Sequence, residues 1–252
     1  IGTDGAATSN DLDMFTALRL TALLHKGVGG DPTVVPSHRA LRMATIDGVE
    51  LTLDVLEVVP ESRVVLAKGA TRVELALDGQ AVSLTHAGVS DGDEREGVAS
   101  SWQLSLGLLM HYCELHPDAS RTVRWLMRPA RTTTGAAHVF FSEQAALASW
   151  LGSGSSIGAA GTRYALDLGP GVTMTGRVLA HSPGRDLALS WEEDDQSVVV
   201  LRTLPQPFEP DVRLVVLSYS RWIERAPPQS RLDLLEAAHH RLIRLLDSDR
   251  EA

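Results

Sequence analysis

The sequence predicts two tandem α+β domains, each an antiparallel curved sheet wrapped around a long C-terminal helix. Short segments of alternating apolar residues, such as Leu51–Val55 and Val73–Leu77, are typical of strands with one buried face. Two longer segments carry apolar residues at spacings of three and four, which indicates amphipathic helices that close each domain. Similar blocks also recur in the same order at offsets of 123 to 133 positions.

Internal similarity is the basis for the tandem arrangement. Three pairs of segments correspond in order and nearly in spacing, although their identity is low. The pairs are Met14–Leu24 with Val139–Leu151, Val55–Gly69 with Val178–Glu192, and Ala81–Val89 with Leu214–Trp222. A repeat of this length favours a duplicated structural unit.

The first unit is expected to open with a short helix over 11–25, followed by strands. The predicted strands span 40–46, 51–59, 63–68, 71–77 and 81–86. Asp47-Gly48 and Asp78-Gly79 separate predicted strands and favour tight hairpins. Because hairpins join neighbouring strands, we expect an antiparallel sheet rather than the parallel sheet of nucleotide-binding folds.

The second unit is expected to repeat this order, with its short helix over 143–151. Its predicted strands span 122–127, 164–168, 172–180, 186–191, 197–203 and 213–219. About 20 residues precede its short helix, whereas the first unit has only IGTDGAATSN there, with no initiator Met. We therefore expect the opening strand of the first domain to be missing or incomplete, with a leader absent or the chain beginning within a domain.

The two closing helices have the clearest periodicity. The first stripe contains Val98, Trp102, Leu106, Leu109 and Cys113, and the second contains Leu232, Leu235, His239, Leu242 and Leu246. Pro117 ends the first helix because proline disfavours helical geometry in the residue before it. The predicted domains therefore span 1–117 and 121–252.

Composition narrows the classes of partner. The 252 residues include 44% hydrophobic and 22% charged side chains, with a net charge of −9. This balance argues against a nucleic-acid surface, which needs clustered Lys and Arg, and against an anionic membrane surface. One Cys excludes an intrachain disulfide, and no apolar run approaches the roughly 18–20 residues that span a bilayer. We expect a cytoplasmic protein with no nucleic-acid or membrane partner.

The end of the first unit resembles the family of activators of the ninety-kilodalton heat-shock-protein ATPase. The family's pattern is a Leu-Thr-His strand, a polar loop, and a last helix with Trp and spaced Leu. The matching residues are Leu84, Thr85, His86, Trp102, Leu106 and Leu109. The segment EVVPESRVVLAKG looks like the preceding family segment. The resemblance covers about 50–115 and is weaker over 136–246, where Ser218-Tyr219 replaces the Thr-His pair.

This family lies within the START and pollen-allergen-like (SRPBCC) superfamily, so the resemblance implies two helix-grip domains. It also implies a cavity between each sheet and its long helix. Many relatives bind apolar molecules there, some are enzymes and some assist chaperones. No catalytic set is common to the family, so none is assigned to this chain.

The candidate ligand-binding residues are those expected to line these cavities: His86, Trp102, Trp150, Tyr164, Trp191, Tyr219, Leu235 and His239. The two histidines are the notable ones, because histidine titrates near neutral pH and can bind an acidic ligand or act as a base. A hydrogen bond to a backbone carbonyl is the structural alternative for both. Ordinary core packing equally explains the aromatic residues.

Other reactive patterns lack the context that their chemistry needs. In the segment His111–His116, the pairs with ligand spacing point in different directions, so no metal site is expected, and Cys113 is read as buried. WEEDDQ is expected to be a solvated hairpin, with a divalent-cation site as the alternative. GSGSSIGAAG follows a helix and lacks Lys, so it is read as a flexible loop rather than a phosphate loop.

The predicted fold and candidate residues lead to three hypotheses for the function. The first is a non-catalytic binding or chaperone-assisting module with cavities for apolar small molecules, and no cofactor. The second is a cyclase or hydrolase of the superfamily type, which requires His86 or His239 in an open pocket. The third is a protein-interaction scaffold with two surfaces. The sequence favours a role without catalysis, with an apolar small molecule, a chaperone or another protein as partner.

Overall fold

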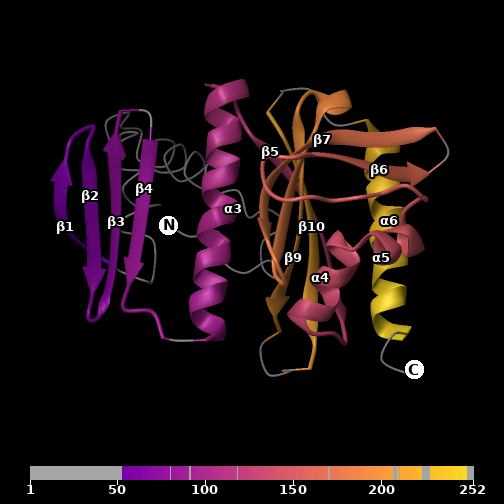
Figure 1. Ribbon diagram of the computed structural model, residues 1–252, viewed down its shortest axis with the longest axis horizontal. Helices are drawn as coiled ribbons and strands as arrows, with labels where there is room; N and C mark the ends of the chain where they lie inside the picture. Colours follow the sequence, from indigo (N-terminus) through magenta and orange to yellow (C-terminus); the bar gives the residue numbers. More distant parts are fainter. Residues whose placement is uncertain are drawn as a thin grey trace, which may run out of the picture. The chain divides into compact units, whose positions relative to one another are not determined.

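The computed structural model describes residues 53–248 apart from 80, 91, 118, 170, 207, 208, 210 and 223–227. Within this part, the chain is α+β with antiparallel sheets and a long C-terminal helix, which confirms the predicted fold class (Figure 1). Contacts divide the chain into two compact units, Ile1–Arg95 and Glu96–Ala252. The predicted domain limits, 1–117 and 121–252, differ from this division by about one helix and stay a prediction.

The first unit contains a four-stranded antiparallel meander with strands paired in chain order. Its strands are β1 (Asp54–Val59), β2 (Arg63–Lys68), β3 (Thr71–Asp78) and β4 (Ala81–Ala87). Short connections at Gly69 and Gly79 take a positive φ, as hairpin turns require. Val65 and Val73 are its fully buried side chains among the residues described.

The second unit is built on a six-stranded antiparallel sheet in the order β5-β10-β9-β8-β7-β6. The strands are β5 (Thr122–Ala130), β6 (Arg163–Gly169), β7 (Val172–Ser182), β8 (Asp186–Trp191), β9 (Ser197–Pro205) and β10 (Arg213–Arg221). The helices are α3 (Asp93–Leu115), α4 (Thr134–Ser142), α5 (Gln144–Trp150) and α6 (Gln229–Ser248), with a 3-10 turn, η1, at Glu192–Asp194. In the hairpin-joined part of the sheet, β6 to β9 each pair with the next strand along the chain, and β10 also pairs with β5.

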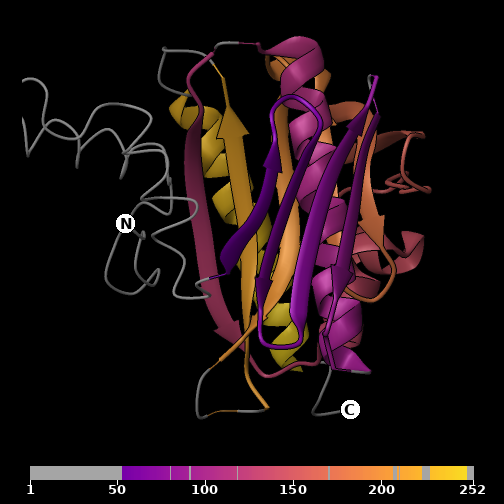
Figure 2. The same ribbon diagram turned by 90° about the vertical axis from the view of Figure 1, so that its left-hand side faces the viewer.

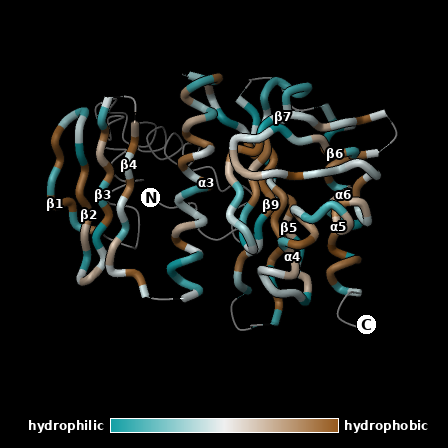
Figure 3. Tube along the Cα trace, in the orientation of Figure 1, coloured by the Kyte–Doolittle hydropathy of each residue, from teal (hydrophilic) through white to brown (hydrophobic). Residues whose placement is uncertain are grey.

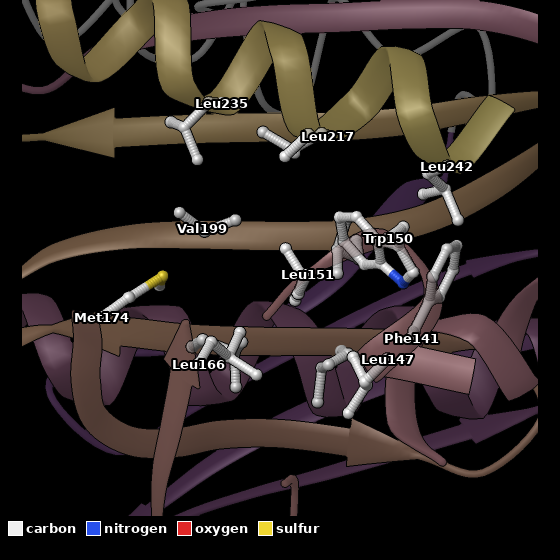
Figure 4. Packing of buried hydrophobic residues seen from close by; sticks show 14 of the residues in the cluster. Phe141, Leu147, Trp150, Leu151, Leu166, Met174, Val199, Leu217, Leu235 and Leu242 are labelled. Atoms are coloured by element: carbon white, nitrogen blue, oxygen red, sulfur yellow. The ribbon is translucent and has the colours of Figure 1, made fainter. Parts of the chain in front are cut away.

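Helix α6 buries its predicted apolar stripe on one face of this sheet. Leu235, His239, Leu242 and Leu246 are buried, and Leu232 packs at the margin of the same cluster. Figure 4 shows Leu235 and Leu242 reaching from the helix toward Leu217, Val199 and the aromatic residues of α4 and α5. Each such side chain contributes roughly 1.5–3 kcal/mol by leaving water, so this interface holds the helix on the sheet.

Helix α3 covers the opposite face of the same sheet (Figure 1). Leu104 packs with residues of β7, β8 and β9 and with Trp222, forming a second apolar cluster: Leu104, Ala180, Ala188, Val198, Val200 and Trp222. Cover on both faces explains why β8 is buried along its whole length and β9 is buried from Ser197 to Leu201, and Figure 3 shows that these central strands are largely hydrophobic.

The predicted orientation of α3 is therefore wrong. Its buried residues are Ser100, Leu104 and His111, whereas Leu109 and Cys113 of the predicted stripe are exposed. The stripe and the buried face differ because the helix is apolar on more than one side, so periodicity alone does not select the side that packs.

Most predicted strands and the extents of both long helices agree with the structure, with bounds shifted by a few residues, although α3 packs on the sheet of the second unit and not on that of the first. Helix α4 was not predicted, although Thr133 caps it by accepting a hydrogen bond from the Ala136 amide, at 3.1 Å. The helix predicted over 11–25 and the strand over 40–46 lie outside the described residues. Each helix in the described part of the chain is too short or too polar to span a bilayer.

Gly107 lets α3 approach β7 closely. A Cβ atom at Gly107 would lie 2.6 Å from the carbonyl oxygen of Leu179, whereas one at Gly97 would meet only the Arg185 guanidinium at 3.5 Å. Replacing glycine by alanine gains the same helix propensity at both positions. The difference in stability between the two variants therefore reports the steric contact between α3 and β7 alone. We expect Gly107→Ala to be less stable than Gly97→Ala by about 1–3 kcal/mol in urea unfolding. Equal stabilities would contradict the described packing of α3.

Candidate functional site

The α6 side of the sheet in the second unit gathers six of the eight predicted lining residues. Trp150, Tyr164, Trp191, Tyr219, Leu235 and His239 all lie on the α6 side of its sheet, and none is more than 5% exposed. His86 is half-buried on β4 of the first unit, and Trp102 is half-buried on α3. Ligand binding by these eight residues stays a prediction.

The polar atoms of several of these core residues are hydrogen-bonded inside the protein. The His239 imidazole Nε2 donates to the Val215 carbonyl at 3.1 Å, and the Trp150 indole donates to Phe140 at 2.8 Å. The Tyr164 hydroxyl donates to the carbonyl of Ser190. Burial lowers the pKa of His239 to about 4, so it is neutral at pH 7. His239 Nε2 therefore serves as a hydrogen-bond donor to the backbone of β10.

The acidic turn after β8 is built differently from the solvated hairpin that was predicted. Asp194 is buried, accepts a hydrogen bond from the Tyr219 hydroxyl, and lies 3.7 Å from Nε of the buried Arg221. Its neighbour Asp195 is exposed and pairs with the same guanidinium at 3.0 Å. The prediction is wrong for Asp194 because Arg221, far along the chain, compensates its charge within the fold. Burial, followed by Asp194, raises the pKa of Tyr219.

Two histidines face each other beside α4. The rings of His138 and His181 stack with centroids 5.2 Å apart, and both Nε2 atoms are buried without a hydrogen-bond partner. His181 Nδ1 donates to the Gly158 carbonyl at 2.9 Å. Burial, and secondarily the charge of His181, lowers the pKa of His138 to about 4. His138 is therefore neutral near pH 7, and protonating it costs stability.

The histidines at the end of α3 serve the packing of the turn after η1. His111 Nε2 and His116 Nε2 lie 2.8 Å and 3.3 Å from the Gln196 carbonyl, and His116 stacks on Trp222 at 4.6 Å. Cys113 points to solvent, away from these contacts. Among the residues described, no group of three or more His, Cys, Asp or Glu side chains is placed to hold a metal ion.

An open groove runs between edge strand β5 and helix α6. Its volume is about 590 Å³, and it is lined by Arg128, Ala237, His240, Arg241, Ile243 and Arg244. Figure 2 shows β5 running beside the yellow α6 at the margin of the sheet. On β5, Arg128 pairs in register with Val215, whose side chain belongs to the α6-side core, so Arg128 faces the helix. The α6 residues recur at spacings of three and four and so lie on one helix face.

The groove is cationic, although the chain as a whole is acidic. Three of its six lining residues are arginines, and none is a carboxylate. Arg241 is held in place because its Nε donates to the Trp150 carbonyl at 2.7 Å. Outside the lining, Glu236 Oε1 lies 4.0 Å from His240 Nε2. Clustered guanidinium groups beside an apolar floor residue, Ile243, form a concave feature suited to a small anionic molecule.

The groove was not predicted from the sequence. The signal was present on α6, where Ala237, His240, Arg241 and Arg244 share a face next to the apolar stripe. Arg128 could not be added, because its position depends on the pairing of β5 with β10. Likewise, the Asp194–Arg221 pair joins segments that only the folded sheet brings together.

Comparison with known proteins adds a similarity confined to the N-terminal part. Over 48 residues, which are 19% of its length, the chain is 62% identical to a 5-methylthioadenosine/S-adenosylhomocysteine deaminase of Moorella thermoacetica. Over 50 residues it is 46% identical to a 5′-deoxyadenosine deaminase of Methanosarcina acetivorans. These matches span 11% and 12% of the two enzymes. No protein-family model matches the chain.

Solved structures resemble about half of the chain at low identity. A protein of unknown function from Staphylococcus aureus matches 54% of the chain and 99% of its own length, with 7% identity and a TM-score of 0.42. Aha1 from Colwellia psychrerythraea matches 50% and 96%, with 12% identity and a TM-score of 0.43. An AHSA1-like protein from Aeromonas hydrophila matches 50% and 93%, with 14% identity and a TM-score of 0.40. At these values the likenesses bear on neither activity nor partners.

Proposed function

We propose that the second unit is a non-catalytic binding module that takes a small ligand in the groove between β5 and α6. The observation that carries this proposal is the groove itself, an open concavity of about 590 Å³ on a rigid sheet edge. Concave sites with a few convergent polar groups are the usual places for small ligands. Arg241, fixed by the Trp150 carbonyl, gives the groove one pre-oriented polar group.

The interior between sheet and helix is a weaker place for a ligand. A molecule there would have to separate side chains such as Trp191, Met174 and Leu242, which are almost fully buried. Tightly packed interiors resist such insertion because contacts are lost on every side. The Nε2 atom of His239 is also occupied, since it donates to the Val215 carbonyl. These points favour binding at the groove over an enzyme that uses a cavity histidine.

The proposal is tested by filling the groove. Ala237 is exposed and lines it, so Ala237→Trp places an indole where the ligand would lie. Ligand-observed NMR with a library of water-soluble fragments is the measurement. We expect fragments that bind the wild type to bind Ala237→Trp at least tenfold more weakly, which is about 1.4 kcal/mol.

The matched control places the same indole outside the groove. Glu236 is exposed, precedes Ala237 on α6 and does not line the groove, so Glu236→Trp should leave fragment binding unchanged. Fragments or apolar ligands that bind both tryptophan variants as well as the wild type would place the ligand elsewhere and refute the groove as its site. A chaperone-assisting role and a scaffold role stay predictions.

A second candidate function concerns the N-terminal part, which resembles the deaminases. The identity of 62% over 48 residues supports a deaminase of 5′-methylthioadenosine or S-adenosylhomocysteine as the origin of that segment. The match covers 11% of the enzyme's length, so the activity itself is a separate question. Incubating the chain with each nucleoside and measuring released ammonia tests it. Release of ammonia supports the candidate, and its absence at high protein concentration rejects it for this chain.

A further inference from the structure

We propose that the groove between β5 and α6 recognises a phosphate or pyrophosphate group carried by a small ligand. This inference rests on the proposed binding function and names the chemical class of its ligand. The juxtaposition of Arg128 from the sheet edge with Arg241 and Arg244 from the helix is the feature that carries it. The three side chains enter one concavity from two different elements.

A cluster of guanidinium groups suits a phosphate ligand better than it suits a ligand with a single carboxylate. Each presents a planar fork of N–H donors that matches two oxygens of a phosphate, and the group keeps its charge at all physiological pH values. A phosphate monoester or pyrophosphate carries more than one negative charge and three or more acceptor oxygens. A multivalent anion of this kind offers enough acceptor oxygens to engage all three guanidinium groups.

The arginines also lack internal neutralisation within the part of the chain described. No ion pair with a described carboxylate within 4.0 Å involves Arg128, Arg241 or Arg244, whereas Arg221, Arg202 and Arg185 each have an acidic partner. Asp247 lies nearby on α6, but its Oδ1 accepts a hydrogen bond from the Arg131 backbone amide at 3.1 Å. The cationic charge of the groove is therefore directed to solvent, where it attracts anions.

The groove also contains one guanidinium held in place by a hydrogen bond, that of Arg241, and one imidazole, that of His240. The bond from Arg241 Nε to the Trp150 carbonyl uses one of the five N–H donors of that guanidinium, and it reduces the rotamer freedom that is lost on binding. His240 supplies an imidazole on the same helix face. The Glu236 carboxylate lies 4.0 Å from His240 Nε2 and is half-exposed to solvent.

The test compares pyrophosphate binding by three proteins with isothermal titration calorimetry. We expect the wild type to bind sodium pyrophosphate, and the double variant Arg128→Gln/Arg244→Gln to bind at least tenfold more weakly. Arg124→Gln is the matched control, because Arg124 is exposed on the same strand and face but does not line the groove. Its affinity should equal that of the wild type, and binding should weaken as salt is raised.

The outcomes separate this inference from the proposed function. Equal pyrophosphate affinity in the wild type and the double variant, or no binding at all, overturns the phosphate inference. If neutral fragments still bind and are lost in Ala237→Trp, the groove remains the binding site while the inferred ligand class fails. If nothing binds in the groove, both proposals fail.

Phosphate chemistry can come from a soluble ester or from a lipid headgroup. A second arm therefore measures sedimentation with phosphatidylcholine vesicles that contain phosphatidic acid, using the same three proteins. Vesicle binding that is lost in the double variant assigns the phosphate to a headgroup. Pyrophosphate binding without vesicle binding assigns it to a soluble ligand. Both results support phosphate recognition, and vesicle binding equal in all three proteins contradicts its location in the groove.

Discussion

Replacing Asp194 by Asn is expected to lower the free energy of unfolding of the second unit by about 3 kcal/mol. The change removes the buried carboxylate that accepts from Tyr219 and faces Arg221, while keeping its size and shape. Stripping one partner from a buried ion pair costs about 3–5 kcal/mol because the other charge stays buried. The lower end applies because Asp195 still pairs with Arg221. Urea unfolding followed by tryptophan fluorescence measures the loss.

Asp195→Asn is the matched control for this result. Asp195 contacts the same guanidinium, but its side chain is 66% exposed, and exposed ion pairs contribute at most about 1 kcal/mol. Asn tolerates the left-handed backbone at this position, where φ is 52°, so no strain is added. If both substitutions cost the same, the stabilising role of burial at Asp194 is refuted.

Acidification from pH 7 to pH 5 is expected to lower the free energy of unfolding by about 4 kcal/mol through two buried histidines. Burial holds the pKa of His138 and of His239 at about 4, below the value of 6.5 of an unfolded chain. The unfolded state therefore binds more protons in this window, so stability is full above pH 6.5 and is lost as pH falls toward 4. Each histidine contributes about 2 kcal/mol of the loss at pH 5.

Single substitutions assign this pH dependence. Removing either titrating group, as in His239→Gln or His138→Gln, should reduce the loss between pH 7 and pH 5 by about half. His240→Gln is the control, because His240 is exposed and adjacent to His239 on the same helix. Urea unfolding at pH 7, 6 and 5 gives the slopes. Parallel slopes in the wild type and both core variants would show that other groups control acid sensitivity.

The sequence predicted local structure better than it predicted contacts. Alternation and turn dipeptides located the strands of both sheets, and a three-and-four spacing located α3 and α6, because each pattern reflects one buried face. The stripe of α6 was correct since only one side of that helix is strongly apolar. The stripe of α3 was wrong because the sheet it covers selected Leu104 instead of Leu109.

One signal for the packing of α3 was available in the strands rather than in the helix. Val198–Leu201 is apolar without alternation, which is typical of a strand covered on both faces. The groove and the Asp194–Arg221 pair had no comparable signal. Each joins residues separated widely along the chain, and their proximity follows from strand order, which short-range patterns do not encode.

The position of α3 has a consequence for synthesis of the chain. The helix is complete at Leu115, but Trp222, the last member of the apolar cluster that covers it, emerges about 100 residues later. At ribosomal rates of about 5–20 residues per second, roughly 5–20 s pass between synthesis of the helix face that contains Leu104 and synthesis of Trp222. During this interval the nascent chain presents an apolar helix face without its sheet, and so the second unit completes its folding only after β10 has left the ribosome.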